Sequence, residues 1–277
     1  MKRILTIQDI SCVGKCSLTV ALPIISAFGV ETSVLPTAVL STHTAFKGFT
    51  FRDLTCDMLD IAKHWKDQNI SFDALYTGYL GSYEQLNIVS NLIDNFKTKD
   101  NFVLIDPVMA DNGSLYVGFN QDFADEMAKL CSKADIIVPN LTEASFMLKE
   151  PYIEKGYDED YTKSTLKKLT SLGAKIAVLT GVRFDNERIG AYAYDSTTDS
   201  YFSYFREYLP ESFHGTGDVF ASTLCGALTI KKNLLNAIKI AVDYTVESIN
   251  ITIKSPDKNW YGVEFEKAMP FLIERIK

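Results

Sequence analysis

The sequence His214-Gly215-Thr216-Gly217-Asp218-Val219-Phe220-Ala221-Ser222 joins a glycine-framed turn to a helix. Apolar residues follow at helical spacing and predict one buried helix face: Phe220, Leu224, Ala227 and Leu228. Gly215 and Gly217 can adopt backbone angles that are closed to other residues, so several N–H groups can point at one spot. Such a helix start attracts phosphate, because its donors are unsatisfied and the helix dipole is positive there.

Asp218 lies in the middle of this predicted anion site. A carboxylate repels phosphate, so it makes a poor anion ligand there. It suits a base that takes a proton from a hydroxyl while the amides hold the developing charge. The alternative is that Asp218 caps the helix and the glycines serve a tight turn. These residues alone leave both interpretations open.

Composition describes an ordinary globular protein. The chain has 277 residues, 47% of them hydrophobic and 23% charged, which suffices for one α/β domain with a large core. The net charge of -7 argues against broad binding of nucleic acid or membrane surfaces. No apolar run reaches the length of a membrane span, and residues 1–3 lead straight into a predicted strand, so we expect a cytoplasmic protein. The five scattered cysteines favour free thiols.

Strand and helix patterns alternate along the whole chain. Apolar runs predict strands over residues 4–7, 32–40, 74–78, 102–105, 134–138 and 176–181. Amphipathic patterns predict helices over residues 18–28, 53–66, 83–96, 234–253 and 263–276, and another around Leu166 and Leu169. Alternation over 189–194 and 201–204 predicts an antiparallel hairpin. The fold class is therefore α/β: three α/β/α layers, a mostly parallel sheet with an antiparallel edge hairpin, and a single domain over 1–277.

Polar residues follow several of the predicted strands. Ligands of open α/β sheets collect at the carboxyl ends of strands, which places Asp9 and Asp106 near a site. An acid at such an end can hold a metal ion or its waters beside phosphates. Asn140 and Glu143 either reach a shared water or Mg²⁺, or form a capping box, and the two roles are compatible.

Five segments in order resemble one protein family. The stretch 214–220 followed by a helix of small residues resembles the signature of the ribokinase-like superfamily, specifically its vitamin B6 and hydroxymethylpyrimidine kinases. The whole set is similar to pyridoxal kinases: Ser41-Thr42-His43-Thr44, Gly78-Tyr79, Asp106-Pro107-Val108-Met109, Asn140-x-x-Glu143 and Gly215-Thr216-Gly217-Asp218.

The resemblance implies roles for individual residues. Asp218 would be the catalytic base, and the amides of Gly215, Thr216 and Gly217 would form the anion hole. Four residues would face ATP: Asp106, Asn140, Glu143 and Thr180. Of these, Asp106 and Glu143 would also hold Mg²⁺. Five would face the substrate: Asp9, His43, Thr44, Tyr79 and Tyr116. Family members also imply a homodimer and a monovalent cation such as K⁺ near the nucleotide.

Some of these segments have plainer explanations. The hydroxyl-rich stretch 41–44 also suits a hydrogen-bonding turn, and Tyr79 also suits a core tyrosine beside a turn. Two positions depart from the family pattern. Ala110 replaces a usual glycine, and Asp9 stands where pyridoxal kinases usually have serine, with Ile10 in place of the following histidine. A carboxylate at position 9 can pair with a protonated ring nitrogen or with the amine of pyridoxamine, which predicts a preference for pyridoxamine or another basic heterocycle.

The resulting expectation is ATP-dependent phosphorylation of the 5'-hydroxymethyl group of pyridoxal, pyridoxamine or pyridoxine, in vitamin B6 salvage. The runner-up is a hydroxymethylpyrimidine (phosphate) kinase of thiamine synthesis. A non-catalytic B6-binding protein is disfavoured because Asp218, Asp106 and Glu143 are retained. An NAD-dependent oxidoreductase would need a Gly-x-Gly-x-x-Gly after the first strand, and none is present.

Overall fold

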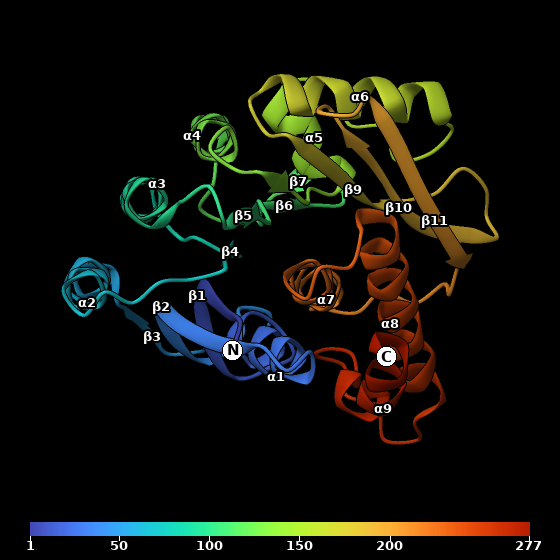
Figure 1. The fold of residues 1–277 in the computed structure, drawn as a ribbon. Helices are drawn as coiled ribbons and strands as arrows, with labels where there is room; N and C mark the ends of the chain where they lie inside the picture. The colour runs from blue at the N-terminus through green and yellow to red at the C-terminus, as the bar shows by residue number, and fades with distance from the viewer. The chain divides into compact units, whose positions relative to one another are not determined.

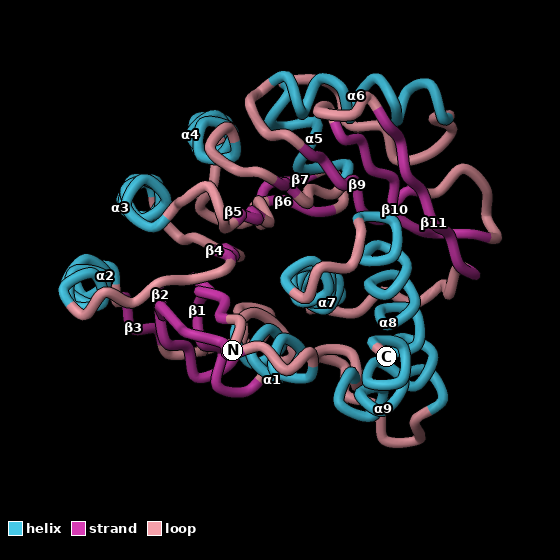
Figure 2. The backbone as a smooth tube through the Cα atoms, viewed as in Figure 1, coloured by secondary structure: helices cyan, strands magenta, loops and turns pink.

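The computed structural model describes residues 1–277, which form two compact units (Figure 1). The first unit combines Met1–Gly78 with Leu209–Lys277, and the second unit is Tyr79–Tyr208. Each unit carries its own strands and helices (Figure 2).

The strands of the first unit form a mostly parallel sheet in the order β4-β1-β2-β3. Their bounds are β1 (Arg3–Val13), β2 (Glu31–Thr42), β3 (Phe51–Asp53) and β4 (Ala74–Thr77). β1 pairs in parallel with β2 and β4, and β3 is antiparallel to β2. The strand predicted over 4–7 is therefore too short. A register shift between Gln8 and Ile10 accommodates one extra residue of β2, and pairing with β2 then continues to Val13. Asp9 thus lies within β1, opposite a bulge of β2, and not beyond the end of the strand.

Five helices belong to the first unit: α1 (Leu18–Ala27), α2 (Thr55–Asp67), α7 (Thr216–Thr229), α8 (Leu234–Lys254) and α9 (Phe265–Ile276). α1 packs on β1 and α7, α7 packs on α8, and α8 packs on α9, while α2 covers β2. The small residues of α7 permit this close packing. A Cβ on Gly226 would lie 2.6 Å from the ring of Phe28 in the segment after α1.

The second unit has the strand order β5-β8-β9-β10-β11. Their bounds are β5 (Phe102–Ile105), β8 (Ile136–Ile137), β9 (Ile176–Val182), β10 (Arg188–Asp195) and β11 (Ser200–Glu207). β5, β8 and β9 are parallel, and β10 is antiparallel to both β9 and β11. The predicted hairpin is confirmed. A second hairpin, β6 (Ala110–Asp111) with β7 (Ser114–Leu115), has strands too short for a periodicity signal.

The helices of the second unit are α3 (Tyr83–Phe96), α4 (Gln121–Cys131), α5 (Leu141–Leu148) and α6 (Glu159–Ser171). Sequence patterns did not predict α4, although Asn120 caps it by accepting a hydrogen bond from Phe123 N–H at 3.0 Å. The α/β class is confirmed, with mostly parallel strands and an antiparallel hairpin. The prediction of a single domain stays a prediction. No helix combines the length and apolarity needed to cross a membrane.

Candidate active site

The start of α7 has the geometry that its glycines predict. Gly215 is the N-cap residue and adopts a left-handed conformation with φ of 79°. A Cβ there would lie 1.6 Å from the carbonyl oxygen of Lys15, so only glycine fits. The N–H groups of the first turn, including those of Thr216 and Gly217, have no acceptor within the helix. Asp218 is the third residue of α7 and not its cap, so the helix-cap interpretation of Asp218 is wrong.

Asp218 occupies an electrostatically unusual position. Its carboxylate is partly buried and accepts a hydrogen bond from the backbone N–H of Ser17. Burial raises the pKa of Asp218 to about 7, the Ser17 N–H opposes that shift, and the negative charge of Asp9 adds to it. A carboxylate with this pKa can accept a proton near neutral pH.

Asp9 lies beside Asp218 and is held by two hydroxyl groups. Ser17 Oγ donates to Asp9 Oδ1 at 2.6 Å, and Ser11 Oγ donates to Asp9 Oδ2 at 3.0 Å. Asp9 is only 4% exposed, and burial raises its pKa while the hydroxyls lower it. Ser17 stands at the N-cap position of α1, but its side chain caps nothing. Its hydroxyl donates to Asp9 and is therefore not used to cap the helix.

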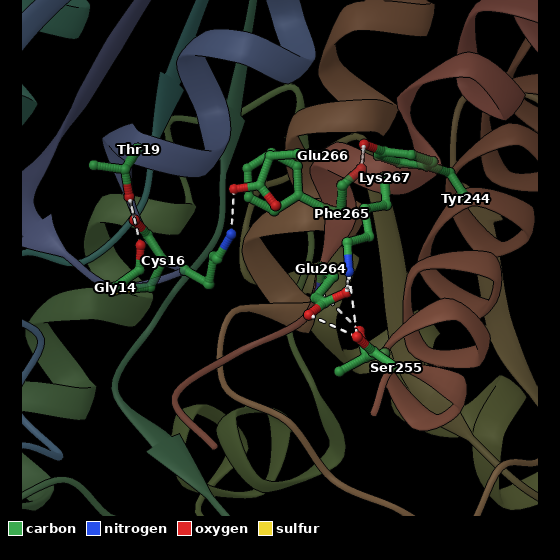
Figure 3. Close-up of polar contacts among 11 residues, drawn as sticks. Gly14, Cys16, Thr19, Tyr244, Ser255, Glu264, Phe265, Glu266 and Lys267 are labelled. Atoms are coloured by element: carbon green, nitrogen blue, oxygen red, sulfur yellow. Dashed lines mark hydrogen bonds and ion pairs between the residues drawn. The ribbon is translucent and has the colours of Figure 1, made fainter. Parts of the chain in front are cut away.

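The loop between β1 and α1 is ordered by contacts from both sides. Thr19 Oγ1 donates to the carbonyl oxygens of Cys16 at 2.8 Å and Gly14 at 3.3 Å (Figure 3). Lys15 forms an ion pair with Glu266 of α9, and its ammonium lies 5.4 Å from the ring centre of Phe265. These contacts hold the carbonyl of Lys15 against the Gly215 turn.

His43 is buried and structurally committed. Its Nδ1 accepts from Ala45 N–H at 3.2 Å, and its Nε2 lies 3.0 Å from the Tyr261 carbonyl oxygen. Because an N–H can only donate and a carbonyl can only accept, this pattern selects the neutral Nε2–H tautomer. Burial lowers the pKa of His43, in agreement with a neutral ring. Thr44 is exposed on the following turn.

An aromatic cluster surrounds His43. Phe46 and Trp260 have ring centres 4.5 Å apart, and the rings of His43 and His214 are 5.1 Å apart. Trp260 is 59% exposed. Sequence reasoning singled out neither Trp260 nor Tyr261, because they follow α8 with no periodic or motif signal.

The second unit carries its own cluster of carboxylates at the strand ends. Asp106 directly follows β5 and is 6% exposed. Glu143 is 3% exposed and accepts from Asn140 N–H at 2.8 Å and Met109 N–H at 3.3 Å. Asn140 Oδ1 in turn accepts from Glu143 N–H at 2.8 Å, which confirms the capping box. Burial, with a contribution from Asp111, raises the pKa of Glu143 to about 8 against the backbone N–H groups.

The oxygen atoms of these carboxylates are of the kind that binds Mg²⁺. No group of three or more His, Cys, Asp or Glu side chains forms a metal-binding cluster. Mg²⁺, however, commonly takes only one or two protein carboxylates together with phosphates and waters. Burial raises the pKa of the Cys131 thiol, and the negative charges of Glu143 and Asp106 add to that shift. Buried oxygen ligands of net negative charge fit such an ion.

Three further predicted site residues also belong to the second unit. Thr180 donates its N–H to the Pro139 carbonyl at 3.0 Å and bridges to Asn140. Tyr79 lies with its ring centre 5.8 Å from that of Phe119. Tyr116 follows β7 and is 40% exposed. The first unit therefore gathers Asp9, His43, Thr44 and residues 215–218, and the second unit holds the rest.

The matching family model and the similar solved structures both indicate a kinase of small heterocyclic alcohols. The model of the family "Phosphomethylpyrimidine kinase" matches residues 24–260. A crystal structure of a Bacteroides thetaiotaomicron protein assigned as a phosphomethylpyrimidine kinase is 39% identical with a TM-score of 0.94, and the match covers 98% of this chain and 93% of that one. A second crystal form of it was solved with pyridoxal.

Two kinases of B6 vitamers are also similar to this chain. The structure of pyridoxal kinase from Lactobacillus plantarum is 28% identical with a TM-score of 0.90, covering 99% of this chain and 97% of that one. Pyridoxine kinase of Bacillus subtilis is 29% identical over 188 residues, which are 65% of each chain.

Proposed function

We propose that this chain, which belongs to the phosphomethylpyrimidine kinase family, phosphorylates the 5'-hydroxymethyl group of B6 vitamers with ATP. The chain is related to the pyridoxal kinases and is a phosphotransferase of ribokinase-like fold. Pyridoxal, pyridoxamine and pyridoxine are the proposed acceptors, in salvage of vitamin B6. The observation that carries the proposal is Asp218 at the start of α7 with a pKa near 7.

The chemical step follows from that arrangement. Asp218 takes the proton of the hydroxymethyl group, the oxygen forms a bond to the terminal phosphorus of ATP, and the bond to the bridging oxygen breaks to release ADP. The N–H groups of Gly215, Thr216 and Gly217 stabilise the charge on the transferred group. A base of pKa about 7 suits this transfer, since it is substantially ionised at neutral pH and still binds a proton well.

The residues of the second unit have proposed roles on the nucleotide side. Asp106 and Glu143 would hold Mg²⁺, which neutralises phosphate charge when bound. Asn140 orients Glu143 through the reciprocal pair of hydrogen bonds at 2.8 Å. Thr180 is proposed to contact ATP.

In the first unit, His43 and Thr44 are the proposed substrate contacts. In the second unit, Tyr79 and Tyr116 keep the substrate role that the family resemblance implies. His43 cannot exchange a proton without giving up one of its backbone partners, because both ring nitrogens are occupied. We therefore propose that His43 packs against the substrate without exchanging a proton, and that the hydroxyl of Thr44 makes the polar contact from this segment.

Hydroxymethylpyrimidine (phosphate) kinase remains the second candidate, because the matching family model is described as phosphomethylpyrimidine kinase. The two candidates differ only in the acceptor. We expect steady-state assays with ATP and Mg²⁺ to give higher kcat/KM for pyridoxal, pyridoxamine or pyridoxine than for hydroxymethylpyrimidine. Preference for the pyrimidine over all three vitamers would reverse the assignment.

The role of Asp218 needs a separate test. Asp218→Asn should lower kcat about a hundredfold or more, because the proton acceptor is lost. Asp73→Asn, in the same unit, alters an aspartate that pairs with Lys2 on the surface and should leave kcat unchanged. Turnover by Asp218→Asn at the parental rate would contradict the mechanism.

A further inference from the structure

We infer that Asp9 acts on Asp218 and not on the substrate: Ser17 holds the two carboxylates together, and the negative charge of Asp9 makes Asp218 a stronger base. The inference rests on the proposed function for the catalytic meaning of Asp218. The coupling between the two carboxylates itself is a property of the protein without substrate.

Ser17 is the residue that joins the two carboxylates. Its hydroxyl donates to Asp9 Oδ1 at 2.6 Å. The segment that ends at Ser17 lies against the start of α7, because a Cβ on Gly215 would be 1.6 Å from the carbonyl oxygen of Lys15 and 3.6 Å from Cα of Cys16. In this position the backbone N–H of Ser17 lowers the pKa of Asp218. Ser17 has a positive φ of 52° with ψ of -135°, a combination that residues with a Cβ rarely adopt. That conformation directs the N–H and the hydroxyl of one residue to two acceptors from segments more than two hundred positions apart.

The orientation of Asp9 argues against direct substrate binding. Ser17 and Ser11 each donate to a different oxygen of its carboxylate, and the side chain is 4% exposed. β1 continues to pair with β2 beyond Asp9, as far as Val13, so Asp9 lies within a strand and not on a free loop. A carboxylate held in this way exerts its effect through its charge.

A catalytic base at the start of a helix needs such a neighbour. The dipole and free N–H groups of α7 stabilise a negative charge on Asp218 and so weaken it as a base. The N–H of Ser17 does the same. Burial and the charge of Asp9 act in the opposite direction, and the resulting pKa of Asp218 is about 7.

The other ionisable groups around the pair do not replace Asp9. Cys16 lies beside both carboxylates, and burial together with those charges raises its pKa to about 12, so its thiol stays neutral. His43, after β2, is held neutral by its two backbone partners. Lys15 is paired with Glu266 of α9, and His214, before α7, is exposed next to the His43 ring. Asp9 is the fixed charge that raises the basicity of Asp218.

The test is Asp9→Asn, which keeps the size of the side chain and an oxygen for the Ser17 hydroxyl while removing the charge. We expect the acidic limb of the pH profile of kcat/KM to move down by about one pH unit. The plateau should fall severalfold because the base is weaker. The ratio of kcat/KM for pyridoxamine over pyridoxal should stay unchanged. Asp73→Asn is the matched control and should leave the limb in place.

A second measurement is independent of turnover. The ¹³C carboxylate resonances of substrate-free protein, titrated in the parent and in Asp9→Asn, should show the midpoint of Asp218 moving to lower pH. An unmoved midpoint in the titration, or an unmoved acidic limb with a changed vitamer ratio, would overturn the inference and favour a substrate contact. If Asp218→Asn keeps full activity while the midpoint moves, the coupling stands and the proposed function fails.

Discussion

At the residue scale, the raised pKa of Asp218 affects both the proposed catalysis and the stability of the fold. Its pKa is about 7 in the folded chain, well above that of an ordinary aspartate, with burial the largest cause. The folded state therefore binds this proton more tightly than the unfolded state does. Stability from this group is fully present at acidic pH and is lost as the pH rises through about 7. The protein holds an unfavourable charge in its folded state at the pH where Asp218 serves as a base.

Asp218→Asn should for this reason stabilise the protein at high pH. We expect its free energy of unfolding to exceed that of the parent by about 1–2 kcal/mol at pH 8, a discounted value because Asp218 is partly exposed, and by less at pH 5. Urea unfolding at the two pH values measures the difference. Asp73→Asn should have the opposite sign at pH 8. Burial opposes ionisation of Asp73, but Lys2 and the Arg3 N–H lower its pKa on balance. Equal effects of Asp218→Asn at both pH values would refute the linkage.

At the scale of the element, α7 depends on two glycines with different requirements. Gly215 has a φ of 79° and backbone contact with Lys15, whereas an added Cβ on Gly217 would meet nothing within 4 Å. One glycine is thus required by sterics, and the other leaves room for a side chain. Substitutions at these two glycines therefore distinguish the steric requirement at Gly215 from the proposed use of the Gly217 N–H in catalysis.

Gly215→Ala should destabilise the protein by about 2 kcal/mol or more, because both its conformation and its contact with the Lys15 carbonyl exclude a methyl group. Gly217→Ala should leave the free energy of unfolding unchanged or raise it by up to about 1 kcal/mol, since alanine favours a helix. Chemical denaturation of the two variants makes the comparison. A smaller loss for Gly215→Ala than for Gly217→Ala would show that the turn is shaped differently.

At the scale of the whole molecule, the first unit is assembled from segments far apart in sequence. Its second segment contributes α7, α8 and α9. Arg275 of α9 donates two hydrogen bonds to Asp243 Oδ2 of α8, at 2.6 and 2.9 Å. Asp243 is 2% exposed, so Arg275 compensates a buried carboxylate. Tyr244 of α8 also donates to the Phe265 carbonyl of α9 at 2.8 Å (Figure 3).

Arg275→Met should therefore lower the free energy of unfolding by about 2–4 kcal/mol, because it leaves the buried carboxylate of Asp243 without its guanidinium. Adding Asp243→Asn should recover part of the loss, since the second change removes the charge. A double-mutant cycle by urea unfolding measures the coupling. Additive losses in the cycle would mean that the ion pair contributes nothing beyond its separate side chains.

Local patterns in the sequence determined the class of fold and many residues of the candidate site. The strand over 102–105 and the helix over 83–96 match their observed bounds, because apolar runs and helical periodicity report burial directly. The capping box of Asn140 and Glu143 followed from a spacing of three residues. Each of these signals lies within one element, where neighbouring residues decide the outcome.

Only the tertiary structure decided which groups Asp9, Ser17 and His43 contact. The hydrogen bond from Ser17 to Asp218 and the one between His43 and Tyr261 join positions about two hundred residues apart. Periodicity records which side chains are buried but not which donor meets which acceptor. The true end of β1 was hidden for the same reason, since a bulge is set by pairing with β2. Partners across the fold are chosen by packing, and no local stretch of sequence contains that information.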